Sequence, residues 1–113
     1  MKFSNEVHLV GRLIKNNDGN LLKEVVVGSG RKVTNFRVSV PYQSKDKDGK
    51  TQDRDNRFFV TAWGDTGTIL SSLKESDVVD VKGYLRNQGW KDKEGNKKFR
   101  QEIVAQSIVS VKE

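Results

Sequence analysis

Apolar and polar residues alternate along most of this chain, and in two segments a glycine stands within the apolar row. Residues 5–14 and 77–86 each carry apolar side chains at every second position, which predicts strands with one buried face. These rows are Val7, Leu9, Gly11 and Leu13, and Val79, Val81, Gly83 and Leu85. A glycine at such a place marks a bend or the close approach of another backbone. Strands that bend while one face stays apolar fit a small closed barrel, a shape that often binds nucleic acid strands.

The same alternation predicts the remaining strands, and clusters of turn residues separate them. We expect strands at 21–27, 31–41, 57–63 and 97–111, with turns at 16–20, 28–30 and 92–96. The stretch 43–56 is polar throughout, with a turn at Asp48-Gly49, so we expect it to be a mobile hairpin loop.

A single segment, about 65–75, has helical spacing, with Ile69, Leu70 and Leu73 on one side and Asp65 or Thr66 able to cap its start. A helix between the third and fourth barrel strands is the OB arrangement, provided that segment 21–27 pairs with the first strand. We therefore predict a mostly β chain with one short helix, folded as a five-stranded OB barrel with a long β-hairpin extension. Another small β-barrel or a β-sandwich is the alternative.

Length and composition narrow the class of protein. A chain of 113 residues is expected to form one domain, 1–113. The absence of cysteine excludes disulfides and thiolate metal sites, and His8 alone is too little for a zinc site or a histidine dyad. No apolar run approaches the roughly 20 residues of a membrane span, and residues 1–6 lack the apolar core of a signal peptide. We expect a cytoplasmic, nucleoid-associated protein with no membrane partner.

No arrangement of residues suggests catalysis. Gly28-Ser29-Gly30 lacks the Lys-Ser/Thr of a phosphate-binding loop and precedes a strand, so we interpret it as a turn. Asp46 and Asp48 alternate with lysines on a polar stretch, as solvated surfaces do. No serine stands in a Gly-x-Ser-x-Gly setting. We therefore expect that the protein is not an enzyme and that it binds neither a cofactor nor a metal.

The positive charge of the chain is concentrated in one place. The formal net charge is +6 and the pI about 9.7, which fits a polyanionic partner. Residues 86–100 contain six cations against two carboxylates, so this segment alone carries +4.

Sequence-tolerant binding of a single strand requires cations for the phosphates and flat side chains for the bases. The segment 84–91 interleaves Tyr84, Arg86, Trp90 and Lys91. Trp90 either stacks on bases or folds back against the barrel, and its basic neighbours favour binding.

Residues 57–63 carry an aromatic residue on each face. Phe59 and Trp63 share a face with Thr61, which we interpret as the solvent side of a groove, although the core remains the alternative for Trp63. Tyr42 either caps the groove or covers the base of the hairpin. The full set of candidate DNA-binding residues is Trp63, Trp90, Tyr84, Arg86, Phe59, Arg37, Tyr42, Lys91, Lys97, Lys98 and Arg100.

Four phrases in this order resemble the bacterial-type single-stranded-DNA-binding protein (SSB) family. They are 5–13, 33–40, 59–64 and 79–86, the last followed by Trp90 and a lysine-rich hairpin, and the resemblance covers 5–111. It implies an OB fold with Trp63 and Trp90 at base-stacking positions. It also implies a homo-oligomer, a dimer or tetramer, in which the first strand pairs with its copy and brings Val7, His8 and Leu9 to the interface.

The chain departs from the family pattern in three ways. Arg57 and Ser44 stand where the family has stacking aromatics, and the chain ends at Glu113 without an acidic tail for recruiting replication proteins. We therefore expect either a trimmed core domain or a short form. The predicted function is sequence-independent binding and protection of single-stranded DNA during replication, recombination and repair. The alternatives are a primosome-like accessory protein that bridges DNA and replication proteins, and an RNA-binding OB domain of a translation or cold-shock kind.

Overall fold

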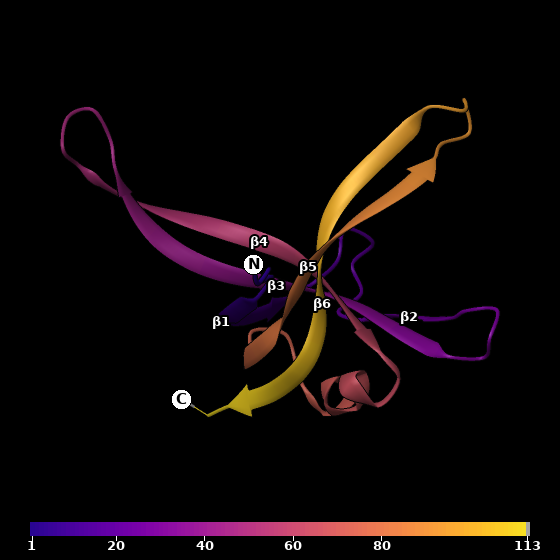
Figure 1. Ribbon diagram of the computed structural model, residues 1–113. Helices are drawn as coiled ribbons and strands as arrows, with labels where there is room; N and C mark the ends of the chain where they lie inside the picture. Colours follow the sequence, from indigo (N-terminus) through magenta and orange to yellow (C-terminus); the bar gives the residue numbers. More distant parts are fainter. Residues whose placement is uncertain (113) are drawn as a thin grey trace.

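Six strands and one short helix make up the computed structural model, which describes residues 1–112 (Figure 1). The elements are β1 (Val7–Ile14), β2 (Lys23–Val26), β3 (Lys32–Lys45), β4 (Thr51–Trp63), the 3-10 helix η1 (Gly64–Ser72), β5 (Val78–Lys91) and β6 (Lys97–Val111).

The strands form one sheet that closes on itself. Their order is β1-β5-β6-β4-β3-β2, and an additional pairing of β1 with β3 joins the ends of the barrel. Every neighbouring pair is antiparallel except β4 and β6, which run parallel over only three residue pairs, Val60–Ile103, Thr61–Val104 and Ala62–Ala105. The barrel is therefore five-stranded and mixed, with η1 between its third and fourth strands. This confirms the predicted OB-like class.

The barrel interior is filled by the apolar rows that the alternation predicted. The buried cluster consists of Leu13, Phe36, Val38, Val60, Ala62, Leu70, Val79, Val81, Ile103, Ala105 and Ile108. Phe36 is 1 % exposed, and Val7 and Leu9 pack against the cluster while partly buried. These side chains are buried together because each strand keeps one face apolar as it bends around the barrel.

Both glycines within the apolar rows lie where another backbone comes very close. A Cβ built on Gly83 would lie 1.9 Å from the carbonyl oxygen of Val104, and one on Gly11 would lie 2.4 Å from that of Ser39. The ladder between β5 and β6 also shifts register between Lys82 and Gly83. These contacts confirm the prediction of close approach, and they let β1 and β5 bend around the barrel.

The prediction of a loop over all of 43–56 was wrong, whereas the turn predicted at Asp48-Gly49 is confirmed. β3 and β4 continue as a paired ribbon as far as Lys45 and Thr51, so only 46–50 form the turn (Figure 1). A two-stranded ribbon in water needs no apolar row, because both of its faces are solvated. Cross-strand polar pairs stabilise it instead. Ser39 Oγ and Arg57 Nε both donate hydrogen bonds to Asp55, and these bonds hold the pKa of Asp55 below its ordinary value.

The turns at the tips of the two long hairpins share one design. In each, an aspartate side chain accepts hydrogen bonds from two backbone N–H groups at 2.9 Å: Asp46 from Asp48 and Lys50, and Asp92 from Glu94 and Asn96. A glycine with positive φ follows in both turns.

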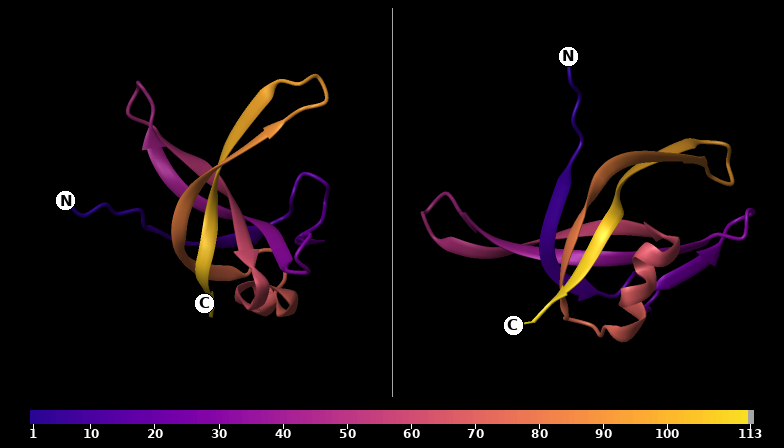
Figure 2. Two further views of the ribbon diagram at one scale, coloured as in Figure 1. Left: turned by 45° about the vertical axis from the view of Figure 1, so that its right-hand side comes forward. Right: turned by 60° about the horizontal axis from the view of Figure 1, so that its bottom comes forward.

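The second strand has a different partner from the one expected. The predicted segment 21–27 is shortened to β2, and β2 pairs with β3 and not with β1. Leu21 and Leu22 pack against the core, and only the residues after them, Lys23–Val26, pair with β3. β2 and the start of β3 therefore form a third hairpin that projects from the barrel (Figure 2).

The helix is shorter than predicted and of the 3-10 type. Trp63 occupies the position before it, and no side chain caps its start, so the prediction of Asp65 or Thr66 as a cap was wrong. Ser71 and Ser72 donate to the carbonyl groups three residues earlier, which fits a 3-10 turn in a segment rich in Gly, Ser and Thr. Leu70 is fully buried, and Ile69 and Leu73 pack beside it. In residues 1–112 there is no helix with the length and apolar character to cross a membrane.

Candidate nucleic-acid interface

The outward face of β3, β4, β5 and β6 gathers polar and aromatic side chains. On β4, Val60 and Ala62 are in the core, so Phe59, Thr61 and Trp63 point the other way. The predicted orientation of this strand is thereby confirmed, and Trp63 is not a core residue. On the paired strands, Arg37 lies opposite Phe59, Asn35 opposite Thr61, and Arg86 opposite Glu102.

Three adjoining hollows run along this face and share lining residues, so they form one groove. The first extends from the turn at Asn16–Asp18 to Phe59. The second shares Asn35, Thr61, Arg100 and Glu102 with the first. The third shares Trp63 and Arg86 with the second and continues to Tyr84 and Gln106.

Guanidinium groups lie over the aromatic rings of this groove. The Cζ of Arg31 is 5.1 Å from the centre of the Trp63 ring, and that of Arg37 is 5.2 Å from Phe59. Arg100 lies 4.7 Å from Phe59 and 5.7 Å from Trp90. Cation–π contacts of this kind hold flat, charged surfaces in place, and such surfaces suit both bases and phosphates.

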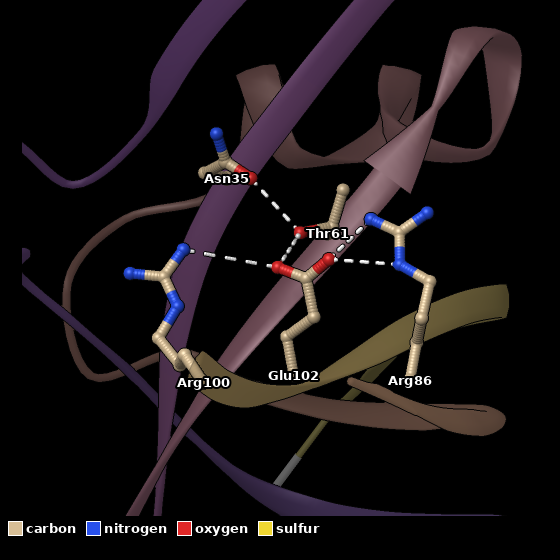
Figure 3. A network of polar contacts seen from close by, with 5 residues as sticks. All are labelled: Asn35, Thr61, Arg86, Arg100 and Glu102. Carbon is tan, nitrogen blue, oxygen red and sulfur yellow. Dashed lines mark hydrogen bonds and ion pairs between the residues drawn. The ribbon is translucent and has the colours of Figure 1, made fainter. Parts of the chain in front are cut away.

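A buried glutamate holds the centre of the groove together (Figure 3). Glu102 is 3 % exposed and accepts hydrogen bonds from Arg86, whose Nε lies 3.1 Å from Oε1. Arg100 Nη2 lies 3.8 Å from Oε2, and the Thr61 hydroxyl lies 3.2 Å from Oε2 and 2.9 Å from Asn35 Oδ1. With its amide nitrogen turned toward the carboxylate, Gln88 also donates to Oε2 at 2.9 Å.

Most of the candidate residues come together on this face. Phe59, Trp63, Tyr84, Arg86 and Arg100 line the groove. Trp90 extends the row along the β5–β6 hairpin, where it pairs with Lys98 and is 46 % exposed.

Arg37 is anchored beside the groove. Its Nη1 donates to Asn17 Oδ1 at 3.1 Å, across the turn between β1 and β2. The guanidinium therefore stays over the Phe59 ring and has one edge already engaged.

Three candidates lie outside the groove. Tyr42 belongs to the same alternating row as Val38 and Val40, opposite the row of Arg37, and is exposed on the β3–β4 hairpin. Lys91 and Lys97 pair with each other at the end of the β5–β6 hairpin, one position out of step with Trp90 and Lys98. Their roles in DNA binding stay predictions.

Glu102 and Arg31 are the residues of this site that the sequence analysis missed. Each lies on the same alternating row as a candidate, Glu102 with Arg100 and Arg31 with Arg37, so strand alternation alone could have identified both. Glu102 was not among the predicted residues, because a carboxylate carries the same sign of charge as the phosphates of DNA.

The residues expected at an oligomer interface lie on β1. Val7 and Leu9 pack their side chains against the core, while His8 Nε2 lies 2.7 Å from Asp80 Oδ1 on the outer surface. Within residues 1–112, the 7–10 part of β1 pairs with β5 alone, so its other edge meets no strand. The Asn5 side chain exchanges two hydrogen bonds with the Leu85 backbone and so extends the β5 side of this ladder.

A metal site is not found in the part of the chain that the structure describes, since no three His, Cys, Asp or Glu side chains cluster there.

Comparison with known structures supports the fold. A Plasmodium falciparum SSB solved in complex with ssDNA superimposes with a TM-score of 0.79 at 17% identity, covering 99% of this chain and 98% of that one. A deletion mutant of the Thermus aquaticus single-stranded DNA binding protein gives a TM-score of 0.77 at 19% identity, covering 96% of this chain and 51% of that one.

Curated relatives and a family match agree with the structures. Single-stranded DNA-binding protein 1 of Xylella fastidiosa is 29% identical over 92% of this chain and 74% of its own length. The protein of the same name from Clostridium acetobutylicum is 27% identical over 92% of this chain and 90% of its own length. The Deinococcus radiodurans single-stranded DNA-binding protein is 29% identical over 71% of this chain, which spans 27% of that protein. Residues 4–111 match the single-strand binding protein family, and the chain therefore belongs to that family.

Proposed function

We propose that this protein binds single-stranded DNA without sequence preference, and coats and protects it during replication, recombination and repair. Family membership implies binding of single-stranded DNA and no enzymatic activity. One observation carries the proposal: the rings of Phe59, Trp63 and Trp90 follow a single groove, each with a guanidinium within 5.7 Å. Every base has a flat face, so a row of rings binds a strand with little regard for sequence.

The proposed path of the strand follows the groove from the turn at Asn16–Asp18 to the β5–β6 hairpin. The Plasmodium falciparum protein of the same fold was solved in complex with ssDNA, which is consistent with a binding face on this barrel. Residues 1–113 would act as one DNA-binding domain. Such a coat acts where the DNA is, so we place the protein in the cytoplasm with the nucleoid.

Tryptophan fluorescence tests this function directly, because both tryptophans lie on the proposed path. We expect oligo-dT to quench the emission strongly, since bases stack on Trp63 or Trp90. Quenching should weaken as salt rises, because bound phosphates release counterions. Titration at low and high salt, with duplex DNA as the control, provides the measurement.

Other outcomes of that titration would favour other functions. Equal quenching by duplex, or none by oligo-dT, would contradict the proposal. Stronger competition by ribo-oligomers than by deoxy-oligomers would indicate RNA binding, because the 2′-hydroxyl is the group that distinguishes the two.

A bridging role is the second candidate, and Arg57 favours it. At this position the family stacks a ring, whereas here the Arg57 side chain is exposed and its Nε pairs with Asp55 at 3.0 Å. A bridging protein would bind oligo-dT weakly and co-purify with a replication protein.

We further propose that the protein is a homo-oligomer, a dimer or tetramer, joined through β1. The open edge at 7–10 offers backbone donors and acceptors to a second copy, and Val7, His8 and Leu9 would lie along it. Val10, 48 % exposed, adds apolar surface beside this edge.

Val10→Lys is expected to convert the oligomer to monomer without unfolding it, because charged residues on an edge strand oppose pairing with another strand. Val26→Lys, at an exposed valine on β2, is the matched control and should leave the oligomer intact. Sedimentation of the three proteins measures the mass. A monomeric wild-type protein would contradict the proposal.

A further inference from the structure

A buried carboxylate is an unexpected feature in a groove meant for a polyanion. Glu102 lies at the centre of the floor, where the first and second hollows meet. It is almost completely removed from solvent, whereas the arginines beside it are about two-fifths exposed. A carboxylate at this place repels phosphates, and its burial is tolerated because several donors surround it.

The donors that surround Glu102 are the groups that would otherwise contact phosphate. Arg86 donates from Nε and Nη2 to Oε1, so one edge of its guanidinium is occupied. Arg100 directs Nη2 toward Oε2 at 3.8 Å. Two cations and one carboxylate leave a charge of +1 where the arginines alone would carry +2. An N–H edge of a guanidinium group binds phosphate through two parallel hydrogen bonds, so the Nε–Nη2 edge of Arg86 is no longer available for that mode of binding.

The guanidinium group of Arg100 lies beside two rings. Its Cζ is 4.7 Å from the centre of the Phe59 ring and 5.7 Å from that of Trp90, while its Nη2 points toward Glu102, so the carboxylate helps to keep Arg100 at the rings. The floor of the groove therefore combines aromatic rings with two guanidinium groups that are paired with a buried carboxylate. Lys98 and Arg31 lie at its rim, without an ion pair to Glu102.

We propose that Glu102 is a positioning residue that makes the groove select bases over phosphates. It hydrogen-bonds one edge of Arg86, attracts Arg100 to its place beside the rings, and repels any phosphate that approaches the floor. The strand then lies with its bases inward and its phosphates along the rim. This inference rests on the proposed single-stranded-DNA function and describes how the same groove orients its ligand.

The test compares two ligands of equal charge on variants of equal charge. Oligo-dT and an abasic oligomer of the same length carry the same phosphates, and only the first carries bases. Glu102→Gln removes the carboxylate charge while keeping a side chain of the same shape. Glu94→Gln removes one charge from the exposed turn of the same hairpin and is the matched control.

We expect the wild-type protein to bind oligo-dT far more tightly than the abasic oligomer. In Glu102→Gln the abasic oligomer should bind roughly tenfold more tightly, because released guanidinium edges can then bind phosphate. Its salt dependence should steepen by about 0.7 in the logarithmic slope for each phosphate gained. Glu94→Gln should change the affinities for both ligands by the same factor and leave their ratio unchanged.

Two results would overturn the inference while leaving the function in place. One is an unchanged ratio of the two affinities in a folded Glu102→Gln protein. The other needs no variant: inorganic polyphosphate of matched charge displacing oligo-dT from the wild-type protein as well as unlabelled oligo-dT does. Absence of oligo-dT binding by the wild-type protein would instead overturn the proposed function itself.

Discussion

Replacing Gly83 by alanine is expected to destabilise the protein by about 3 kcal/mol or more, at or above the upper end of overpacking effects. The new Cβ would lie 1.9 Å from the Val104 carbonyl oxygen, and a backbone atom cannot move aside as the end of a side chain can. Relief would require β5 and β6 to separate at the bulge between Lys82 and Gly83. Urea unfolding followed by circular dichroism measures the change.

Gly89→Ala is the matched control, on the same strand. Its Cβ would approach the Phe99 ring at 3.2 Å, and that ring is exposed and can move. We expect a change within about 0.5 kcal/mol, as for ordinary surface substitutions. Equal urea midpoints for the two variants would show that the close contact at Gly83 does not determine the stability of the protein.

Trp90→Ala is expected to weaken oligo-dT binding by about 1–3 kcal/mol, the stacking energy of one base. Trp90 lies on the groove side of the β5–β6 hairpin, in line with Arg86 and Gln88. Trp63→Ala should cost a similar amount, and the double variant should lose about the sum if the two rings stack on different bases. Fluorescence anisotropy of labelled oligo-dT at fixed salt measures each affinity.

Phe99 provides the control for the tryptophan variants. It is 74 % exposed on the same hairpin but on the opposite face, where it pairs with Gly89. Phe99→Ala should leave the affinity unchanged. A loss as large as that of Trp90→Ala would mean that the strand wraps both faces of the hairpin or avoids the groove.

The fold was predictable wherever one face of a strand is buried. Alternation placed the core residues of β1, β3, β4 and β5, and the rows interrupted by Gly11 and Gly83 indicated the bends. It failed in the outer part of the β3–β4 hairpin, where neither face is buried and cross-strand polar pairs hold the ladder. It also failed for the partner of β2, because pairing between strands depends on the closed barrel and not on local sequence.

The types of residue in the site could be predicted from the sequence, but most of their contacts could not. The aromatic and basic residues of 84–91 were found because a single-strand site requires them. For Trp63 the sequence favoured the solvent side, because it shares a face with Thr61, and left the core as an alternative that the burial of Val60 and Ala62 removes. Glu102 was not found, since a carboxylate is the last residue type expected among phosphate-binding cations. Alternation from Arg100 puts Glu102 on the groove face, but its burial becomes evident only when Arg86, Thr61 and Arg100 meet around it.

The parallel contact between β4 and β6 is one of two places where the barrel can open. Like the contact between β1 and β3, it is only three residue pairs long, and Thr61 lies at its middle. Short joins separate at a lower cost than the long antiparallel ladders beside them. Because Thr61 also contacts Glu102, local opening of the cylinder and loss of the groove floor are one and the same motion. A ligand lying across this join would bind only the closed cylinder, so it would stabilise the fold at one of its two short joins.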